Sequence, residues 1–369
     1  MPLPVSLPPR IRLIVLFGGQ SAEHDVSRAT AAHVLNALDP ERYDVSAIGI
    51  TREGQWVNAD AAAHAALREL RTPSLATESA IETGVDVIGS PTSYHPALAA
   101  DEHIPTVVLP LLHGPMGEDG TVQGLMELLD VAYVGAGVLG SSVSMDKAMA
   151  KVVLASAGIA QAKYRRVFDY ERTAETAQSL VDELGLPMFV KPANMGSSVG
   201  VSKAKTTAEV AEALDTAFVY DRVVVCEEAI VGREIEVAVL GNEHPRASLP
   251  GEIMPGSDFY SYQDKYLEDN ARYFIPADLK PSETEELQAL AVQVFQALRI
   301  EGLARVDFFY EEGGRGFLCN EANTMPGFTP ISMYPKMWQA SGLSYTELID
   351  ELVGLALARH ANRRRATNA

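Results

Sequence analysis

The alternation of hydrophobic and polar positions divides the first third of the chain into strands and helices. Residues 11–17 (IRLIVLF) form a continuous apolar run, which is typical of a parallel strand that is buried on both faces. The segment GGQSAEHDVS follows, and residues 27–38 then have the spacing of a helix. The pattern also predicts strands over residues 43–50 and 106–112 and a helix over residues 121–130. This order predicts an N-terminal α/β domain with a doubly wound sheet.

A different pattern begins near residue 136. Residues 144–158 predict an amphipathic helix with Asp146 close to its start. Residues 186–204 are typical of two strands joined by a Gly/Ser turn, and residues 223–230 of a further apolar strand. The next segment, GREIEVAVLG, alternates as a half-buried strand should.

The last third of the chain combines strands, a polar stretch and a helix. Strands are predicted over residues 303–310 and 316–323, which flank the turn EEGGR, and a helix over residues 344–360. Residues 255–275 are polar and tyrosine-rich with little periodicity, which predicts a long functional loop. Residues 59–104 are Ala-rich and irregular, and the pattern predicts no element there.

Composition then narrows the class of protein. The chain has 369 residues, of which 47% are hydrophobic and 21% charged, as in a globular protein of two or three domains. Its net charge of −19 would repel phosphate backbones and anionic lipids, so we expect no nucleic-acid partner. No apolar run is long enough to span a membrane, and the first ten residues lack the apolar core of a signal peptide.

The two cysteines also bear on the compartment. Cys226 and Cys319 match neither a disulfide framework nor a zinc motif. Reduced thiols are typical of cytosolic proteins. We therefore expect a cytoplasmic protein with no membrane partner.

The two C-terminal strands carry polar residues among apolar ones. Successive side chains of a strand alternate between its faces. The residues predicted to share a face are Arg305, Asp307 and Phe309 on the first strand, and Phe317, Cys319, Glu321 and Asn323 on the second.

If these strands pair, Asp307, Glu321 and Asn323 converge beside Arg305. Carboxylate and amide oxygens are ligands that Mg²⁺ prefers, with waters and substrate phosphates completing its octahedron. The same residues also fit a solvated sheet face on which acids balance Arg305. Because these acids are embedded in apolar strands, the pattern favours the metal site.

The segment VKPANMGSSVGVSKA contains a second candidate site. Lys191 ends an apolar strand, and the backbone N–H groups of GSSVG can point at phosphate oxygens. No GK[ST] follows, so the segment is not a Walker A motif. A Gly/Ser turn alone indicates an ordinary hairpin. Its place after a strand-end lysine favours a flap that covers phosphates.

Two further residues follow predicted strands. Glu23 lies in GGQSAEHDVS and could hold an ammonium group, although for this motif alone a helix-capping turn is the simpler interpretation. His113 ends the strand at residues 106–112, where ligand-binding loops leave parallel sheets. For His113, a structural role and a binding role remain equally open.

Taken in order, the motifs resemble those of the D-alanine–D-alanine ligase family of ATP-grasp enzymes. The matching segments are GGQSAEHDVS, HGPMGEDGTVQG, SMDK, VKPANMGSSVG, GREIEVAVL, YSYQDKY, GLARVDFF and NEANTMPGFTPIS. The resemblance implies an α/β chain with an ATP-grasp fold behind a Rossmann-like, pre-ATP-grasp N-terminal domain. It places that domain at residues 1–135, a central ATP-grasp subdomain at residues 136–227 and a C-terminal one at residues 228–369.

The resemblance also implies roles at the nucleotide. Lys147 and Lys191 correspond to lysines that contact the phosphates and the adenine side of ATP. The other residues with an implied nucleotide role are Glu227 and Ile230 at the adenine edge, Glu234 at the ribose, and Ser197 and Ser198 in the loop over the phosphates.

At the reacting groups, the resemblance implies two Mg²⁺ ions, for which Mn²⁺ can substitute. Their implied ligands are Asp307, Glu321 and Asn323, while Arg305 and the Gly327 amide stabilise the oxyanion. Glu23 corresponds to the residue that holds the ammonium of the first D-alanine. Lys265 and Ser332 are implied to approach the carboxylate of the second substrate and the transferred phosphate of ATP, which makes Lys265 a nucleotide residue as well. Tyr266 is implied to hydrogen-bond toward the flap serine and Glu23.

Members of this family join two D-alanine molecules through a D-alanyl phosphate for peptidoglycan synthesis, and a homodimer is expected. The pair Lys265-Tyr266 is like that of dipeptide-forming members, so ligation of D-alanine to D-lactate ranks second. A Rossmann oxidoreductase would need a glycine fingerprint that GGxxxE does not supply. A non-catalytic nucleotide sensor would share the fold but would not need every metal and phosphate residue.

Overall fold

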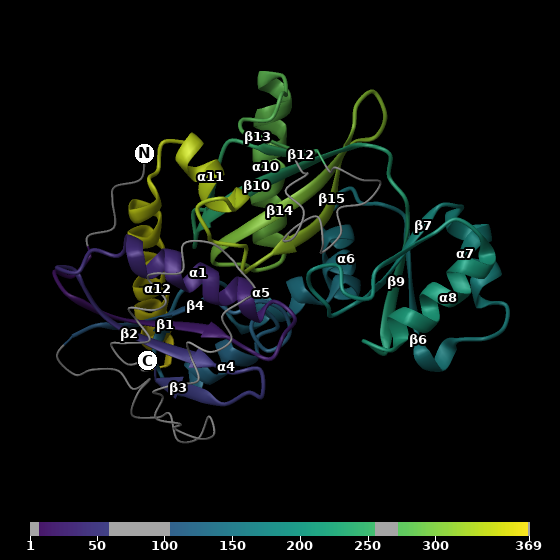
Figure 1. Ribbon diagram of the computed structural model, residues 1–369. Helices are drawn as coiled ribbons and strands as arrows, with labels where there is room; N and C mark the ends of the chain where they lie inside the picture. The colour runs from purple at the N-terminus through teal and green to yellow at the C-terminus, as the bar shows by residue number, and fades with distance from the viewer. Residues whose placement is uncertain (1–6, 59–103, 255–271, 368–369) are drawn as a thin grey trace.

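Three β-sheets make up the computed structural model, which describes residues 7–58, 104–254 and 272–367 (Figure 1). The N-terminal sheet has the strand order β3-β2-β1-β4-β5. Strand β1 pairs in parallel with β2 and β4, and β3 is antiparallel to β2. The strands are β1 (Ile11–Gly18), β2 (Tyr43–Ile50), β3 (Trp56–Asn58), β4 (Thr106–Pro110) and β5 (Ala132–Tyr133). The parallel sheet predicted for this region is confirmed.

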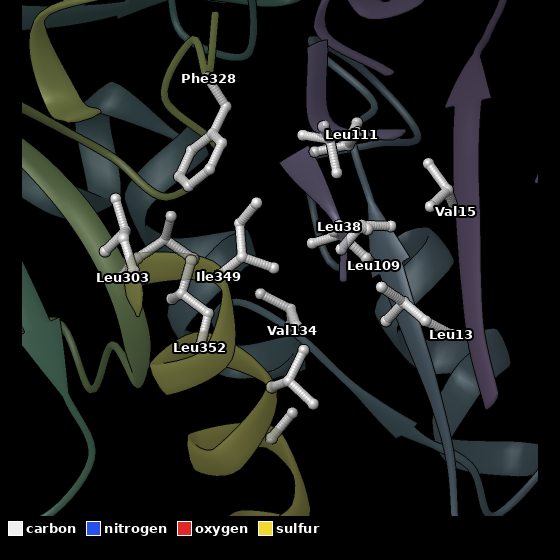
Figure 2. Packing of buried hydrophobic residues seen from close by; sticks show 14 of the residues in the cluster. Leu13, Val15, Leu38, Leu109, Leu111, Val134, Leu303, Phe328, Ile349 and Leu352 are labelled. Carbon is white, nitrogen blue, oxygen red and sulfur yellow. The ribbon is translucent and has the colours of Figure 1, made fainter. Parts of the chain in front are cut away.

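Both faces of the N-terminal sheet are covered, which explains the apolar run from Leu13 to Phe17 in β1. On one face Leu13 and Val15 pack with α1 (His24–Ala37) and with α12 (Tyr345–Thr367), the C-terminal helix. On the other face Ile14 and Leu16 pack with α4 (Thr121–Leu128). Figure 2 shows Leu109 and Val134 between Leu13 and Val15 of β1 on one side and Ile349 and Leu352 of α12 on the other. The last helix of the chain therefore completes the core of the first domain.

The central sheet is antiparallel and has the strand order β6-β9-β7-β8. Its strands are β6 (Tyr164–Phe168), β7 (Met188–Pro192), β8 (Ser202–Ala204) and β9 (Val223–Glu228). Helices α7 (Thr176–Leu184) and α8 (Thr207–Phe218) cover one face. A 3₁₀ turn, η2 (Asp169–Glu171), follows β6. The predicted strand, Gly/Ser turn and strand within residues 186–204 are confirmed as β7 and β8.

The predicted helix over residues 144–158 starts too early. Ser144 and Met145 end the separate helix α5 (Val138–Met145), and α6 (Lys147–Ser156) begins after Asp146. Asp146 is in an extended conformation and its side chain accepts a hydrogen bond from the backbone N–H of Met149. Asp146 thus follows the last residue of α5 and is the N-cap of α6. Apolar residues continue on both sides of it, so the sequence pattern did not reveal the break.

The C-terminal sheet has the order β13-β12-β10-β14-β15, with β11 also paired to β10, and these paired strands are antiparallel. Its strands are β10 (Arg233–Gly241), β11 (Arg246–Ala247), β12 (Gly251–Met254), β13 (Arg272–Phe274), β14 (Gly302–Glu311) and β15 (Gly316–Asn323). The sheet packs with α10 (Pro281–Ala297) and α11 (Met333–Ala340). Residues 255–271 of the predicted loop lie outside the described residues, as do residues 59–103. Residues 272–274, predicted as loop, pair with β12 as a strand.

Strand β10 is not half-buried as its alternation predicted. Every residue from Ile235 to Gly241 is buried. Ile235 and Val237 pack on α10, while Ala238 and Leu240 pack with α11 and α12. Because both faces of this central strand are covered, only its first residues, Arg233 and Glu234, stay partly exposed.

The predicted faces of β15 are also wrong in part. Asp307 pairs with Glu321 but Phe308 pairs with Cys319, so Asn320 is an extra residue in the ladder. Such a bulge shifts the alternation by one position. Phe317 and Cys319 therefore enter the core with Phe308, whereas Glu321 and Asn323 face the opposite side with Asp307.

No helix within the described part of the chain has the length and apolar character that crossing a membrane would require. Both cysteines are buried free thiols, in separate sheets, as expected.

Candidate active site

A cleft of about 420 Å³ lies where the three sheets meet. The central sheet contributes β7 and β9, the C-terminal sheet contributes β10, β14 and β15, and the N-terminal domain contributes the start of α1 and the loop after β4. The cleft is lined by all the predicted site residues that the structure describes: Glu23, Lys147, Lys191, Ser197, Ser198, Glu227, Ile230, Glu234, Arg305, Asp307, Glu321, Asn323, Gly327 and Ser332. The predicted residues Lys265 and Tyr266 lie outside the described residues.

Lysines gather at the side of the cleft formed by the central sheet. Lys191 on β7 donates a hydrogen bond to Glu227 Oε2 at 2.9 Å and lies 3.4 Å from Asn320 Oδ1. Burial acts to lower the pKa of Lys191, but the charge and hydrogen bond of Glu227, together with the charges of Glu321 and Glu234, outweigh it and raise the pKa. Lys147, the first residue of α6, donates to the carbonyl oxygen of Met195 at 2.6 Å. Both ammonium groups are thus held by acceptors beside the Gly/Ser loop.

The Gly/Ser loop between β7 and β8 has unusual backbone angles. Ser197 and Ser198 both have positive φ values, of 47° and 60°, which are uncommon for residues other than glycine. The loop also approaches the N-terminal domain, because a Cβ atom on Gly196 would lie 3.3 Å from Glu23 Oε2. The predicted flap, which is the turn between β7 and β8, therefore lies against Glu23 instead of projecting freely from the sheet.

Glu23 is 7% exposed and directly precedes α1. Its side chain makes no capping hydrogen bond to that helix, so the helix-capping interpretation of GGQSAEHDVS does not explain it. Its carboxylate instead lies at the cleft, beside Gly114 and Gly196. A buried carboxylate on a cleft wall is suited to hold a cationic group of a ligand.

Two neighbours of Glu23 are also buried. Glu118 accepts a hydrogen bond from the backbone N–H of Gly114 at 2.6 Å, and burial together with the nearby charge of Glu23 raises its pKa to about 8. Burial also lowers the pKa of His113, which favours a neutral imidazole. The Nε2 atom of His113 has no hydrogen-bond partner among the described residues. An unsatisfied polar atom in the cleft wall supports the binding role that the sequence left open for His113.

The guanidinium of Arg305 is clamped between carboxylates on the C-terminal sheet. It donates to both oxygens of Asp307, at 2.8 and 2.7 Å, and Glu236 Oε1 lies 3.1 Å from its Nε atom. Burial acts to lower the pKa of Arg305, but these two carboxylates outweigh it and raise the pKa. Arg305 is therefore permanently charged and fixed in direction.

Asp307, Glu321 and Asn323 lie on the same side of the β14–β15 hairpin. Asp307 is directly opposite Glu321, and Arg305 is opposite Asn323. No three His, Cys, Asp or Glu side chains in the described ranges are grouped closely enough to hold a metal by themselves. Two carboxylates and an amide oxygen nevertheless fit Mg²⁺, which binds through one or two carboxylates together with substrate phosphates and water.

A turn closes the cleft beside this hairpin. Ser332 precedes α11, and its Oγ atom accepts a hydrogen bond from the backbone N–H of Thr329 at 3.1 Å. A Cβ atom on Gly327 would lie only 3.0 Å from Ser332 Oγ. Glycine at position 327 thus allows the backbone and this hydroxyl to approach each other closely.

Several residues at the site were missed by the sequence analysis. Glu236 could have been found, because it follows Glu234 by two positions on one strand and so shares its face. Lys151 could also have been found, because it lies one helical turn after Lys147. Glu118 and Asn320 gave no such signal, since the proximity of Glu118 to Glu23 and of Asn320 to Lys191 depends on how distant segments meet.

Comparisons with known proteins agree over almost the whole chain. A family model described as the D-ala D-ala ligase N-terminus matches residues 12–136, and one described as the D-ala D-ala ligase C-terminus matches residues 153–354. The D-alanine–D-alanine ligase of Geobacillus kaustophilus is 48% identical over 358 residues, which cover 96% of each chain. The D-alanine–D-alanine ligase A of Chromobacterium violaceum is 46% identical, covering 95% of this chain and 96% of its own.

Solved structures are similar in the same way. The D-alanine-D-alanine ligase from Coxiella burnetii has a TM-score of 0.84 and 36% identity, covering 98% of both chains. The VanG D-Ala:D-Ser ligase from Enterococcus faecalis has a TM-score of 0.77 and 32% identity, covering 94% of this chain and 99% of its own. The similarity therefore extends through all three sheets around the cleft.

Proposed function

The chain belongs to the D-alanine–D-alanine ligase family, with its ATP-grasp fold, and from this premise we propose how its cleft works. The protein is an ATP-dependent ligase that joins two D-alanine molecules into D-alanyl-D-alanine, a component of peptidoglycan precursors. One observation supports the assignment of roles: Lys147, Lys191, Arg305 and the buried carboxylate of Glu23 line a single cleft.

ATP is needed because a carboxylate is a poor electrophile. A carboxylate oxygen of the first D-alanine attacks the γ-phosphorus, the bond to the bridging oxygen breaks, and ADP leaves. The product is D-alanyl phosphate. The neutral amine of the second D-alanine then attacks the carbonyl carbon, and phosphate leaves with the electrons of the C–O bond. The proton of the amine is released, and no nucleophile from the protein is required.

The lysines and the central sheet hold the nucleotide in this proposal. We assign Lys147 and Lys191 to the phosphate oxygens, where their ammonium groups offset the charge that moves during phosphoryl transfer. Ser197 and Ser198 cover the phosphates from the loop that approaches Glu23. The remaining nucleotide contacts are assigned to Glu227 and Ile230 at the adenine and to Glu234 at the ribose.

A second group of residues is assigned to the two D-alanine molecules and to the carbonyl group that reacts. Arg305 and the backbone N–H of Gly327 stabilise the negative charge of the tetrahedral oxyanion. Glu23 binds the ammonium of the first D-alanine, which orients its carboxylate toward the nucleotide. Ser332 is assigned to the second substrate, together with Lys265 and Tyr266.

Asp307, Glu321 and Asn323 are proposed to hold Mg²⁺, or Mn²⁺ in its place, on the phosphates of ATP. When bound, the metal neutralises phosphate charge and polarises the transferred group. The three side chains supply its oxygen ligands from one side of the β14–β15 hairpin.

The remaining features of the protein follow from the family. We assign residues 1–135 to a substrate-binding domain, residues 136–227 to the central ATP-grasp subdomain and residues 228–369 to the C-terminal one. The enzyme is proposed to be a cytoplasmic homodimer. Size-exclusion chromatography with light scattering tests the dimer, and fractionation of the cells tests the compartment.

The activity is tested with a panel of D-amino acids, in which ADP release and product mass are measured together. D-alanine is expected to give D-alanyl-D-alanine and one ADP per dipeptide. ATP binding with no D-amino-acid-dependent ADP release would favour the non-catalytic nucleotide sensor instead.

The second substrate is D-alanine rather than D-lactate in this proposal. The pair Lys265-Tyr266 brings a cation and a phenol and no histidine, as in the dipeptide-forming branch. Mass analysis of a competition between D-alanine, D-lactate and D-serine at pH 7 should give mainly D-alanyl-D-alanine. A majority of depsipeptide or of a serine-containing product would overturn the acceptor assignment but not the ligase assignment.

A further inference from the structure

A third lysine lies beneath the nucleotide side of the cleft and has no role in the proposed reaction. Lys151 is only 2% exposed, although lysine is among the residues that proteins most rarely bury. It lies on α6 one turn after Lys147, so both ammonium groups point to the same side of the helix. Its ammonium is 5.1 Å from the centre of the Tyr164 ring.

Lys151 and Lys191 share one carboxylate. The Nζ atom of Lys151 is 3.2 Å from Glu227 Oε1, and that of Lys191 is 2.9 Å from Glu227 Oε2. Each oxygen of Glu227 therefore faces its own lysine. Burial alone would raise the pKa of Glu227, but the charges of Lys151 and Lys191 lower it to about 2. The carboxylate thus remains ionised although it is 3% exposed.

The charges of these three side chains do not cancel. Within the triad, two ammonium groups and one carboxylate sum to one positive charge. Glu321 and Glu234 also act on Lys191, each more weakly than Glu227 does. Lys191 lines the cleft, whereas Lys151 does not. If Lys151 carried no charge, Glu227 would neutralise Lys191. The ammonium of Lys191 would then be paired with a carboxylate and would attract an anion only weakly.

A buried ion pair is weak grounds for assigning a stabilising role, because desolvation of the charges can exceed their attraction. A buried triad that carries a net positive charge beside a cleft is better explained by a negatively charged ligand that binds there. We propose that Lys151 is a positioning residue for nucleotide binding. From outside the cleft it neutralises Glu227, and this leaves the charge of Lys191 available to bind phosphate.

This inference rests on the proposed role of Lys191 at the phosphates of ATP. Lys151 itself does not contact the nucleotide in this proposal. It acts through Glu227, so its effect must disappear when Glu227 carries no charge. That dependence distinguishes positioning from a merely structural role, in which each substitution would add its own damage.

The first measurement is the dissociation constant of the Mg²⁺ complex of ATP, obtained by calorimetry on the full-length protein without D-alanine. Lys151→Met, which keeps the length of the side chain and removes the charge, should weaken binding about 30-fold. At saturating ATP its KM for D-alanine should stay within about twofold of wild type. Lys205→Met, an exposed lysine after β8, removes the same charge and should bind ATP as the wild type does.

The second measurement uses the double variant Lys151→Met/Glu227→Gln, which has one positive charge in the triad again. It should bind ATP at least fivefold more tightly than Lys151→Met alone. In the Glu227→Gln background, adding Lys151→Met should change the dissociation constant by less than about threefold. This second comparison remains decisive even if Lys151→Met alone does not fold, because the double variant buries one charge fewer than Glu227→Gln.

The outcomes distinguish the proposed function from the proposed role of Lys151. Wild-type protein that does not bind ATP would remove the proposed function. Wild-type protein that binds ATP, with Lys151→Met binding equally well, would overturn only the role of Lys151. The same follows if Lys151→Met weakens binding more than tenfold in the Glu227→Gln background, because Lys151 would then act independently of Glu227.

Discussion

Arg305 donates hydrogen bonds to both carboxylate oxygens of Asp307, at 2.8 and 2.7 Å. A proposed metal ligand is thus already paired with a cation in the protein by itself. A metal ion must compete with this guanidinium or share its acceptor, and it gains the necessary free energy only when phosphate oxygens add further ligands.

The protein should therefore bind Mg²⁺ weakly unless ATP is present. Mg²⁺ alone at millimolar concentration is expected to raise Tm by less than about 1 °C, whereas Mg²⁺ with ATP should stabilise the fold by roughly 2–3 kcal/mol at a hundredfold excess over Kd. Thermal unfolding with Mg²⁺, with ATP and chelator, and with both ligands measures this. Equal stabilisation by Mg²⁺ alone would show a preformed metal site instead.

Glu321→Ala should abolish turnover while the protein stays folded. Glu321 lines the cleft opposite Asp307 and lies outside the core cluster beneath the hairpin, so its loss removes a proposed metal ligand without opening a cavity. We expect a decrease in kcat of at least about 100-fold. Glu312→Ala, in the exposed turn of the same hairpin, serves as the control. A Glu321→Ala rate within tenfold of wild type, in a protein with unchanged Tm, would contradict the metal assignment.

Stability should depend on pH through Glu118. Burial and the charge of Glu23 raise its pKa to about 8 in the folded protein, from an ordinary value of 4.5. The folded state therefore holds the proton more tightly, and this group's contribution to stability is fully present below pH 4.5 and is lost as pH rises through about 8.

Glu118→Gln imitates the protonated carboxyl and removes this dependence. The Tm of the variant minus that of wild type should increase by roughly 2–4 °C between pH 6 and pH 9. Thermal unfolding across this range measures the difference, and Glu285→Gln, on an exposed position of α10, gives the baseline. A difference that stays constant with pH would mean that Glu118 is ionised in the folded protein throughout.

Arg359→Ala should destabilise the protein without affecting the chemistry directly. Arg359 on α12 is 5% exposed, donates hydrogen bonds to the carbonyl oxygens of Tyr133 and Gly135, and lies 4.2 Å from the centre of the Tyr133 ring. Its removal leaves two carbonyls without a donor, which costs about 2–4 kcal/mol of unfolding free energy.

The matched control for this change is Arg363→Ala on the same helix. Arg363 pairs with Glu127, but its side chain is 53% exposed, and exposed pairs contribute about 0–1 kcal/mol. Urea unfolding of both variants measures the difference. Similar losses for Arg359→Ala and Arg363→Ala would show that the buried contacts of Arg359 have no special weight.

Much of the fold could be predicted because the strongest patterns are local. The apolar run of β1 and the β7–β8 hairpin depend on residues that are adjacent in sequence. Burial of β10 on both faces could not be predicted, since it depends on α10 and on α11 and α12, which follow it by about 50 to 100 residues. The helix break at Asp146 was missed because apolar residues continue on both sides of it.

The candidate site shows the same division. The ordered motifs were enough to predict 14 described residues that line one cleft, because most of the motifs lie at the end of a strand or in a turn. The side-chain partners were not predictable in this way. The pairing of Lys151 with Glu227, and that of Arg305 with Glu236, join segments whose distance in space no local spacing reveals. The extra residue Asn320 likewise becomes visible only against its partner strand.

The position of α12 sets the order in which the chain can mature during translation. The strands of the first sheet leave the ribosome early, but Leu348, Ile349 and Leu352, which cover part of that sheet, are synthesised more than 200 residues after β5. Until then that apolar face has no native cover from α12, and the nascent domain depends on contacts that do not yet exist. A message truncated before α12 would therefore yield a product that is incomplete at its beginning as well as at its end.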